Sequence, residues 1–166
     1  MSGKINEILE RFFNDYKKLE RSVRLFVFRE DGLILYQTSV VDNKTGSSCG
    51  ALMGGTWQAA MTLISFIGGQ QKSSQDYRLS FDSSSEGVHI LASGKYEGFE
   101  IYLGGIYAQQ VNPAPLKNKI KNLNFELRNC IEQLSAKQTA SKTEESYLFS
   151  NISDSEIDAM FAVMES

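Results

Sequence analysis

Residue types that commonly take part in catalysis or metal binding are few in this chain of 166 residues, and the sequence pattern does not group them into one site. Its one histidine, His89, alternates with apolar residues in a strand-like run, and Cys49 and Cys130 lie too far apart for a metal or redox motif. A catalytic site needs several groups that meet, and the sequence marks no nucleophile or orienting carboxylate for His89. We therefore expect a structural or surface histidine, no metal, no cofactor and no catalytic residue, so the chain is predicted not to be an enzyme.

One glycine-rich stretch has the outline of a phosphate-binding loop. Gly50 is followed, after four intervening residues, by Gly55 and Thr56. The stretch lacks the lysine that must reach the phosphates, and it lies inside a helical pattern instead of between a strand and a helix. The chain is therefore not expected to bind a nucleotide itself.

A helix predicted over residues 49–67 has two different sides when projected at about 100° per residue. The broad apolar side, expected to face the core, holds Leu52, Met53, Trp57, Ala60, Leu63, Ile64 and Ile67. The opposite side is built mostly of small residues, namely Ala51, Gly54, Gly55, Gln58, Thr62 and Ser65, with Met61 at its margin. Glycine inside a helix costs about 0.5–1 kcal/mol relative to alanine, so adjacent glycines need a reason. Two reasons stay open: close packing within the fold or between two copies, and a flat shelf on which another protein docks.

The C-terminal residues 148–166 carry the signals of a short amphipathic helix. Ser153 and Glu156 form a capping box, and Ile152 and Ile157 occupy the staple positions around it. An apolar stripe follows at helical spacing and consists of Ile157, Met160, Phe161 and Met164. So short a helix is marginal in water, and the polar residues 135–147 before it are predicted to be a flexible linker. We expect the helix to dock in a groove of a partner; the alternative is that it packs back on its own domain.

The remaining pattern predicts the elements that would position these surfaces. A first helix is predicted from an apolar stripe that runs from Ile5 to Leu19. Two strands follow at 23–28 and 33–37, joined by a turn at Asp31-Gly32. Further strands are predicted at 77–81, 88–92 and 99–107. Asn112 and Pro113 open the last long helix, whose stripe is Leu116, Ile120, Leu123, Leu127, Cys130 or Ile131, and Leu134. The order α-β-β-α-β-β-β-α predicts an α+β fold with an antiparallel five-stranded sheet packed by helices, as a domain over 1–134 followed by the linker and the docking helix.

Composition narrows the classes of partner. Apolar residues make up 42% of the chain, which is enough for a globular core. The net charge of −3 argues against nucleic acid, whose binding depends on basic patches. No apolar run approaches the roughly 18 residues of a membrane span, so no membrane insertion is expected. The isolated cysteines favour a reducing, cytoplasmic location.

The domain resembles the Roadblock (dynein light chain) family over residues 4–134. The resemblance lies in the element order, the hairpin in RLFVFREDGLILYQT and the small-residue helix in CGALMGGTWQAAMTLISFIGG. It implies homodimers or heterodimers that serve Ras-like small GTPases as a platform. The residues expected under the GTPase are Ala51, Gly54, Gly55, Gln58 and Thr62.

The tail FSNISDSEIDAMF resembles that of the MglB group of bacterial polarity regulators, which are Roadblock proteins. The resemblance implies a dimer that accelerates GTP hydrolysis by an MglA-type GTPase without an arginine finger, in cell polarity or motility, and that can concentrate at a cell pole. The implied tail contacts are Ile152, Ser153, Asp154, Glu156, Ile157, Asp158, Met160 and Phe161. The segment SDSEIDAMF is also similar to the FliM segment that binds CheY-like receiver domains, so an adaptor for a response regulator stays as the alternative.

Overall fold

The computed structural model describes residues 2–16, 19–38, 41–68, 73–109 and 112–150. The chain divides into two compact units, Met1–Glu132 and Gln133–Ser166. The first unit contains a sheet of five strands: β1 (Arg24–Arg29), β2 (Ile34–Gln37), β3 (Arg78–Asp82), β4 (Gly87–Tyr96) and β5 (Phe99–Tyr107). Its helices are α1 (Ser2–Asn14), α2 (Asn43–Ile67), the start of α3 (Pro113–Ser150) and the short 3-10 helices η1 (Leu19–Arg21) and η2 (Ser74–Asp76).

The strands lie in the order β2-β1-β5-β4-β3, and every neighbouring pair is antiparallel. This confirms the predicted α+β fold with an antiparallel five-stranded sheet. Two tight turns set the hairpins. The β4–β5 turn has two residues, Glu97 and Gly98, at φ 52° and 86°, the left-handed conformation that two-residue hairpin turns require. In the longer β1–β2 turn, Gly32 has φ +84°, a conformation that favours glycine.

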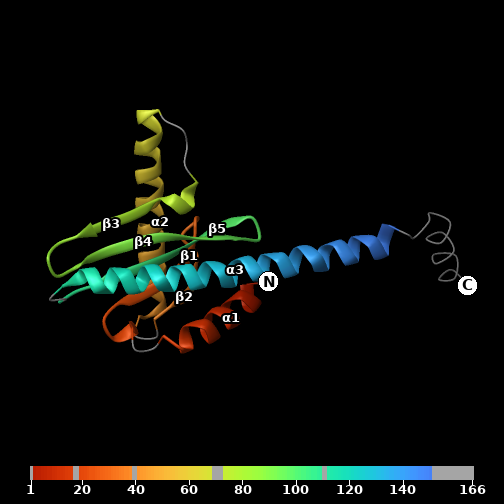
Figure 1. Cartoon of the computed structure of the whole chain (residues 1–166), viewed down its shortest axis with the longest axis horizontal. Helices are drawn as coiled ribbons and strands as arrows, with labels where there is room; N and C mark the ends of the chain where they lie inside the picture. Colours follow the sequence, from red (N-terminus) through yellow and green to blue (C-terminus); the bar gives the residue numbers. More distant parts are fainter. Residues whose placement is uncertain (1, 17–18, 39–40, 69–72, 110–111, 151–166) are drawn as a thin grey trace, which may run out of the picture. The chain divides into compact units, whose positions relative to one another are not determined.

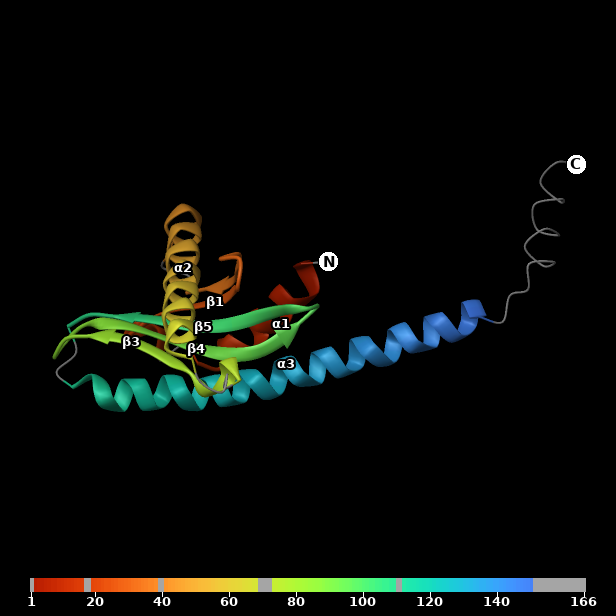
Figure 2. The same cartoon turned by 90° about the horizontal axis from the view of Figure 1, so that it is seen from above.

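Helices cover both faces of the sheet (Figures 1 and 2). The α2 side is built around Phe26 and Phe28 of β1, which pack with Met53 and Trp57 of α2. Successive strand residues point to opposite faces, so the neighbouring residues face the α1 and α3 side; a Cβ on Gly105, for example, would lie 3.0 Å from Ile120 of α3. Nearly all of β1 is therefore buried, because it is covered from both sides.

Helix α3 follows the predicted start but extends beyond the predicted end. The Asn112 side chain accepts a hydrogen bond from the Ala114 N–H at 3.1 Å, as its capping role required. The buried stripe comprises Leu116, Ile120, Leu123, Leu127 and Ile131, which selects Ile131 over the half-buried Cys130.

The expectation of a linker without regular structure at 135–147 is corrected, because α3 continues through these residues to Ser150. The segment contains neither glycine nor proline, and its Ala, Lys, Gln and Glu residues favour helix. A polar composition is compatible with a flexible chain and equally with a helix that is polar on all sides. Residues 151–166, most of the predicted docking helix, lie outside the described residues.

Candidate partner-binding surface

His89, the one histidine of the chain, lies on strand β4. His89 is 6% exposed, and its Nδ1 lies 2.6 Å from the Ser80 hydroxyl on the neighbouring strand. Burial, with smaller contributions from Lys117 and Arg78, lowers the pKa of His89, so it is neutral at pH 7. Among the described residues, no three His, Cys, Asp or Glu side chains come together as metal ligands. In the same part of the chain, no helix is long and apolar enough to cross a membrane.

Helix α2 begins six residues before the predicted start, at Asn43, and its capping residue is Asp42. The Thr45 hydroxyl and the Thr45 N–H both donate to the Asp42 carboxylate, at 2.6 and 2.9 Å. These bonds lower the pKa of the Asp42 carboxyl. The negative charge also lies at the positive end of the helix dipole, so the start of α2 is firmly set.

A ridge of glycines brings α2 against the β1–β2 hairpin. Gly46, Gly50 and Gly54 recur at four-residue spacing and are buried. A Cβ on Gly50 would lie 2.4 Å from the Gly32 carbonyl oxygen and 2.6 Å from Ile34 Cδ1. A Cβ on Gly54 would lie 3.5 Å from Gly32 Cα. Of the two reasons left open for the glycines, close packing within the fold accounts for this ridge.

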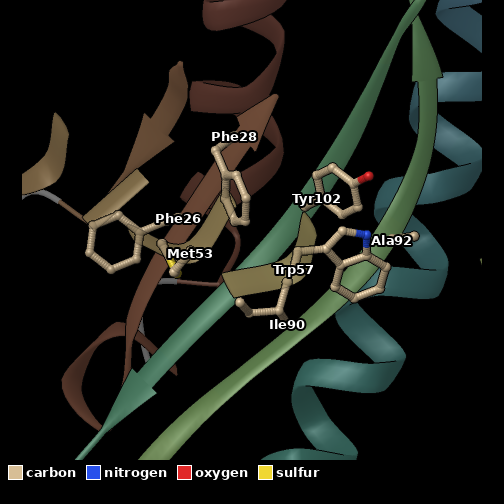
Figure 3. Close-up of a cluster of buried hydrophobic side chains, with 7 residues drawn as sticks. All are labelled: Phe26, Phe28, Met53, Trp57, Ile90, Ala92 and Tyr102. Atoms are coloured by element: carbon tan, nitrogen blue, oxygen red, sulfur yellow. The ribbon is translucent and has the colours of Figure 1, made fainter. Parts of the chain in front are cut away.

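The glycine ridge rotates α2 relative to its predicted orientation. Met53 and Trp57 are buried as predicted and pack with Tyr102; the Trp57 and Tyr102 ring centroids are 4.9 Å apart (Figure 3). Four residues of the predicted core side are exposed instead: Leu52 at 70%, Leu63 at 66%, Ile64 at 39% and Ile67 at 84%. The pattern of apolar side chains alone predicts the wrong orientation, because the closest packing of α2 is made by glycines, which have no side chain.

The small-residue face is therefore only partly as predicted. Ala51, Gly55, Gln58 and Thr62 are exposed, and nothing lies within 4 Å of a Cβ placed on Gly55. Gly54, predicted to lie among them, is buried against the hairpin and does not belong to the exposed face. We call the four exposed residues, together with Leu52, the α2 shelf.

The hydroxyl groups along α2 are turned back to the helix itself. Thr56 donates to the Leu52 carbonyl at 2.7 Å, and Thr62 donates to the Gln58 carbonyl at 2.8 Å. Such bonds satisfy a hydroxyl without an outside partner. Within the α2 shelf, the Thr62 hydroxyl is thus satisfied by the helix itself, and Leu52 is the large apolar side chain.

Three helices on an open five-stranded antiparallel sheet, with a small-residue helix on one face, constitute the Roadblock fold. No protein-family model and no curated protein matches the chain. Solved structures do: MglB of Myxococcus xanthus superposes with a TM-score of 0.57 at 17% identity, over 81% of this chain and 92% of that one.

Two further MglB structures agree with it. The gliding protein MglB of Thermus thermophilus has a TM-score of 0.59 at 13% identity, and an MglB with a tetrameric arrangement has 0.57 at 13%. Each covers 75% of this chain and 90% of its own. At such identities the likeness establishes the fold, which is the MglB type of Roadblock fold that the sequence predicted.

The predicted tail contacts cannot be placed beside the α2 shelf. They are Ile152, Ser153, Asp154, Glu156, Ile157, Asp158, Met160 and Phe161, and all lie outside the described residues.

The apolar end of α2 is exposed, which the sequence-based prediction of a core-facing side did not anticipate. Its signal was present in Leu63, Phe66 and Ile67, three large apolar residues in the last turns before Gly68.

The two kinds of glycine on α2 should respond oppositely to alanine. Gly50→Ala is expected to lower the free energy of unfolding by about 1–3 kcal/mol, because the new methyl group meets the backbone of Gly32. Gly55→Ala is expected to raise it by about 0.5–1 kcal/mol, since the site is open and alanine favours helix. Urea unfolding of both variants would measure the difference, and equal effects would contradict the packing described here.

His89 should make folding stability depend on pH. Its pKa is lowered in the folded state from the ordinary value of 6.5, so between the two pKa values the unfolded chain binds more protons. The contribution of His89 to the free energy of unfolding is therefore fully present above about pH 6.5 and is lost as the pH falls below this value. His89→Gln is expected to flatten this part of the profile, measured by urea unfolding at a series of pH values. An unchanged slope would show that His89 titrates alike in both states.

Proposed function

We propose that this protein is a non-catalytic regulatory scaffold that self-associates, binds a Ras-like small GTPase of the MglA type and stimulates its GTP hydrolysis, in cell polarity or motility. The supporting observation is an MglB-type fold over most of the chain that leaves the outer face of α2 uncovered. The single buried histidine and the lack of a metal-ligand cluster among the described residues support a role through binding.

Self-association is supported by apolar surface at the end of α2 and on the sheet edge. Leu63, Phe66 and Ile67 are 66–84% exposed in the last turns of α2. Phe81, on edge strand β3, is 81% exposed. It lies on the α2 side, because it is two residues from Leu79, which packs against the α2 core. A second copy of the chain, placed across β3 and the end of α2, would remove this surface from water.

Charge substitutions at these exposed apolar residues test the proposed dimer interface. Phe81→Glu and Ile67→Glu, made together, are expected to shift the protein from dimer to monomer in analytical ultracentrifugation, because each places a charge in an apolar interface. Leu33→Glu is the control, since Leu33 is also exposed, at 47%, but lies in the β1–β2 hairpin. The proposed interface would be wrong if the double variant stayed dimeric or if the control dissociated equally.

The α2 shelf is the proposed platform for the GTPase. Small side chains lose little conformational entropy when a partner covers them, and Gly55 lets a partner approach the helix backbone. Leu52, 70% exposed, supplies an apolar anchor of the kind that dominates interface energy. Stimulation then follows if the shelf binds the hydrolysis-competent form of the GTPase switch loops more tightly than the other forms, because differential affinity shifts their populations.

The C-terminal segment is proposed to make a second contact with the same GTPase. Its capping box and apolar stripe specify a helix that is stable only when it buries that stripe. Two linked contacts raise the local concentration of the second one, so a short helix of weak affinity can still strengthen the complex.

The decisive measurement is single-turnover GTP hydrolysis by the Ras-like GTPase of the same cell, with this protein titrated in. Gly55→Arg is expected to weaken stimulation at least about tenfold, because a long charged side chain on the shelf costs about 1.4 kcal/mol or more of binding. Gly3→Arg is the matched control, since Gly3 also has nothing within 4 Å of its Cβ but lies on α1.

A chain ending at Gln138 assigns the tail in the same assay. Weaker stimulation by the shortened chain would place the C-terminal segment in the GTPase complex. If neither chain changes hydrolysis or binds the GTP-loaded GTPase, the proposed activity fails, and the tail peptide should then be tested against phosphorylated receiver domains.

A further inference from the structure

A recessed surface lies on the other side of the sheet from the α2 shelf. It is a cavity of about 350 Å³ lined by η2, the start of β3, the middle of β4 and the exposed side of α3. Figure 2 shows α3 running along this side of the sheet. All of its lining residues belong to the first unit.

The cavity is cationic although the chain as a whole has a net charge of −3. Arg78, Lys121 and Arg128 line it, against the single acid Asp76. The ion pairs found among the described residues involve Arg29, Lys95 and Lys117, and none of the three cavity cations. Asp76 is thus the one carboxylate among the lining residues, and no ion pair found within the described part of the chain neutralises the three cations.

One of these cations is held in a fixed position. A bulge between Ala92 and Gly94 turns the Ala92 carbonyl toward α3, where it accepts from Asn124 Nδ2 at 3.0 Å and from Arg128 Nη2 at 3.2 Å. Ser93 in the bulge donates to Asn124 Oδ1 at 2.5 Å, which fixes the amide in turn. The Arg128 guanidinium is thereby held beside the Ala92 carbonyl, and Arg128 lines the cavity as a positioned cation that can pair with a carboxylate.

An apolar side chain stands beside the charges. Phe125, which lines the same cavity, is 63% exposed, whereas Tyr77, also in the lining, packs against the core on the α2 side. A small inorganic anion would neutralise the cations but leave Phe125 in water. A peptide in which acidic and apolar side chains alternate would satisfy both features, because successive residues of an extended peptide point in opposite directions.

We propose that the cavity between α3 and β3 is a docking site for an extended acidic peptide of a partner protein. Its carboxylates pair with Arg78, Lys121 and Arg128, and an apolar side chain covers Phe125. The site lies on the face opposite the α2 shelf, so a scaffold bound to its GTPase keeps this site for a further partner. The proposal is independent of GTPase binding and is tested without it.

The test uses the full chain and a short fluorescent peptide in which Glu alternates with Leu, with fluorescence anisotropy as the measurement. Lys121→Glu and Arg78→Glu, both on exposed positions, are each expected to weaken binding about tenfold, the value of one charge-assisted contact. Lys119→Glu is the matched control, since it changes the same charge on the same helix but lines a different recess, toward η1. Added salt should weaken binding, because exposed charges are screened.

Three outcomes would overturn the proposal: no binding of the Glu peptide, equal binding of a peptide with Gln in place of Glu, or a loss with Lys119→Glu as large as with Lys121→Glu. Competition by inorganic phosphate as strong as by unlabelled peptide would identify a small-anion site and reject the peptide. Dissociation of the protein's own oligomer by Lys121→Glu would instead make the cavity an interface between copies. A Phe125→Ser variant that binds less tightly, with unchanged thermal stability, would confirm the apolar contact.

Discussion

The close approach of α2 to the β1–β2 hairpin is the constraint on which the rest of the molecule depends. At Gly50 the α2 backbone lies nearer to Gly32 and Ile34 than a side chain would permit, and the buried Gly46 and Gly54 continue this contact along the hairpin. Once the helix is held there, Met53 and Trp57 have only one direction in which to point, and they meet Phe26, Phe28 and Tyr102 in the core of that face (Figure 3). The aromatic core is thus a consequence of where the glycines place the helix.

The same constraint leaves much of α2 uncovered. A helix held along its glycine ridge shows Leu52, Gly55 and Thr62 outward, and its last turns carry Phe66 and Ile67 into solvent at 80% and 84% exposure. Large apolar side chains gathered in this way are unusual on a monomer. The fold therefore exposes an apolar surface at the end of α2, in addition to the small residues of the α2 shelf.

The opposite face of the sheet has a different chemistry. Beside β4, the bulge at Ala92 and the Ser93–Asn124 pair fix the Arg128 guanidinium next to α3. Polar groups buried in this way cost free energy unless each is satisfied, and the bulge is what provides the carbonyl that satisfies two of them. One face of the molecule thus presents small and apolar groups, and the other presents positioned cations, so the two can contact different partners at once.

The sequence by itself determined the element order, the antiparallel sheet and the last helix's buried stripe, because periodicity, turn residues and caps act within a few neighbouring positions. It also located the strands, including the one observed as Phe99–Tyr107, within one or two residues at most ends.

Tertiary structure alone decided which side of α2 faces the sheet, since the packing of its glycines depends on Gly32 and Ile34, which are distant along the chain. It alone decided that α3 continues through 135–147, where composition suits both a linker and a helix. It alone brought Arg78 and Arg128 to one cavity, because a long stretch of chain that includes two strands separates them.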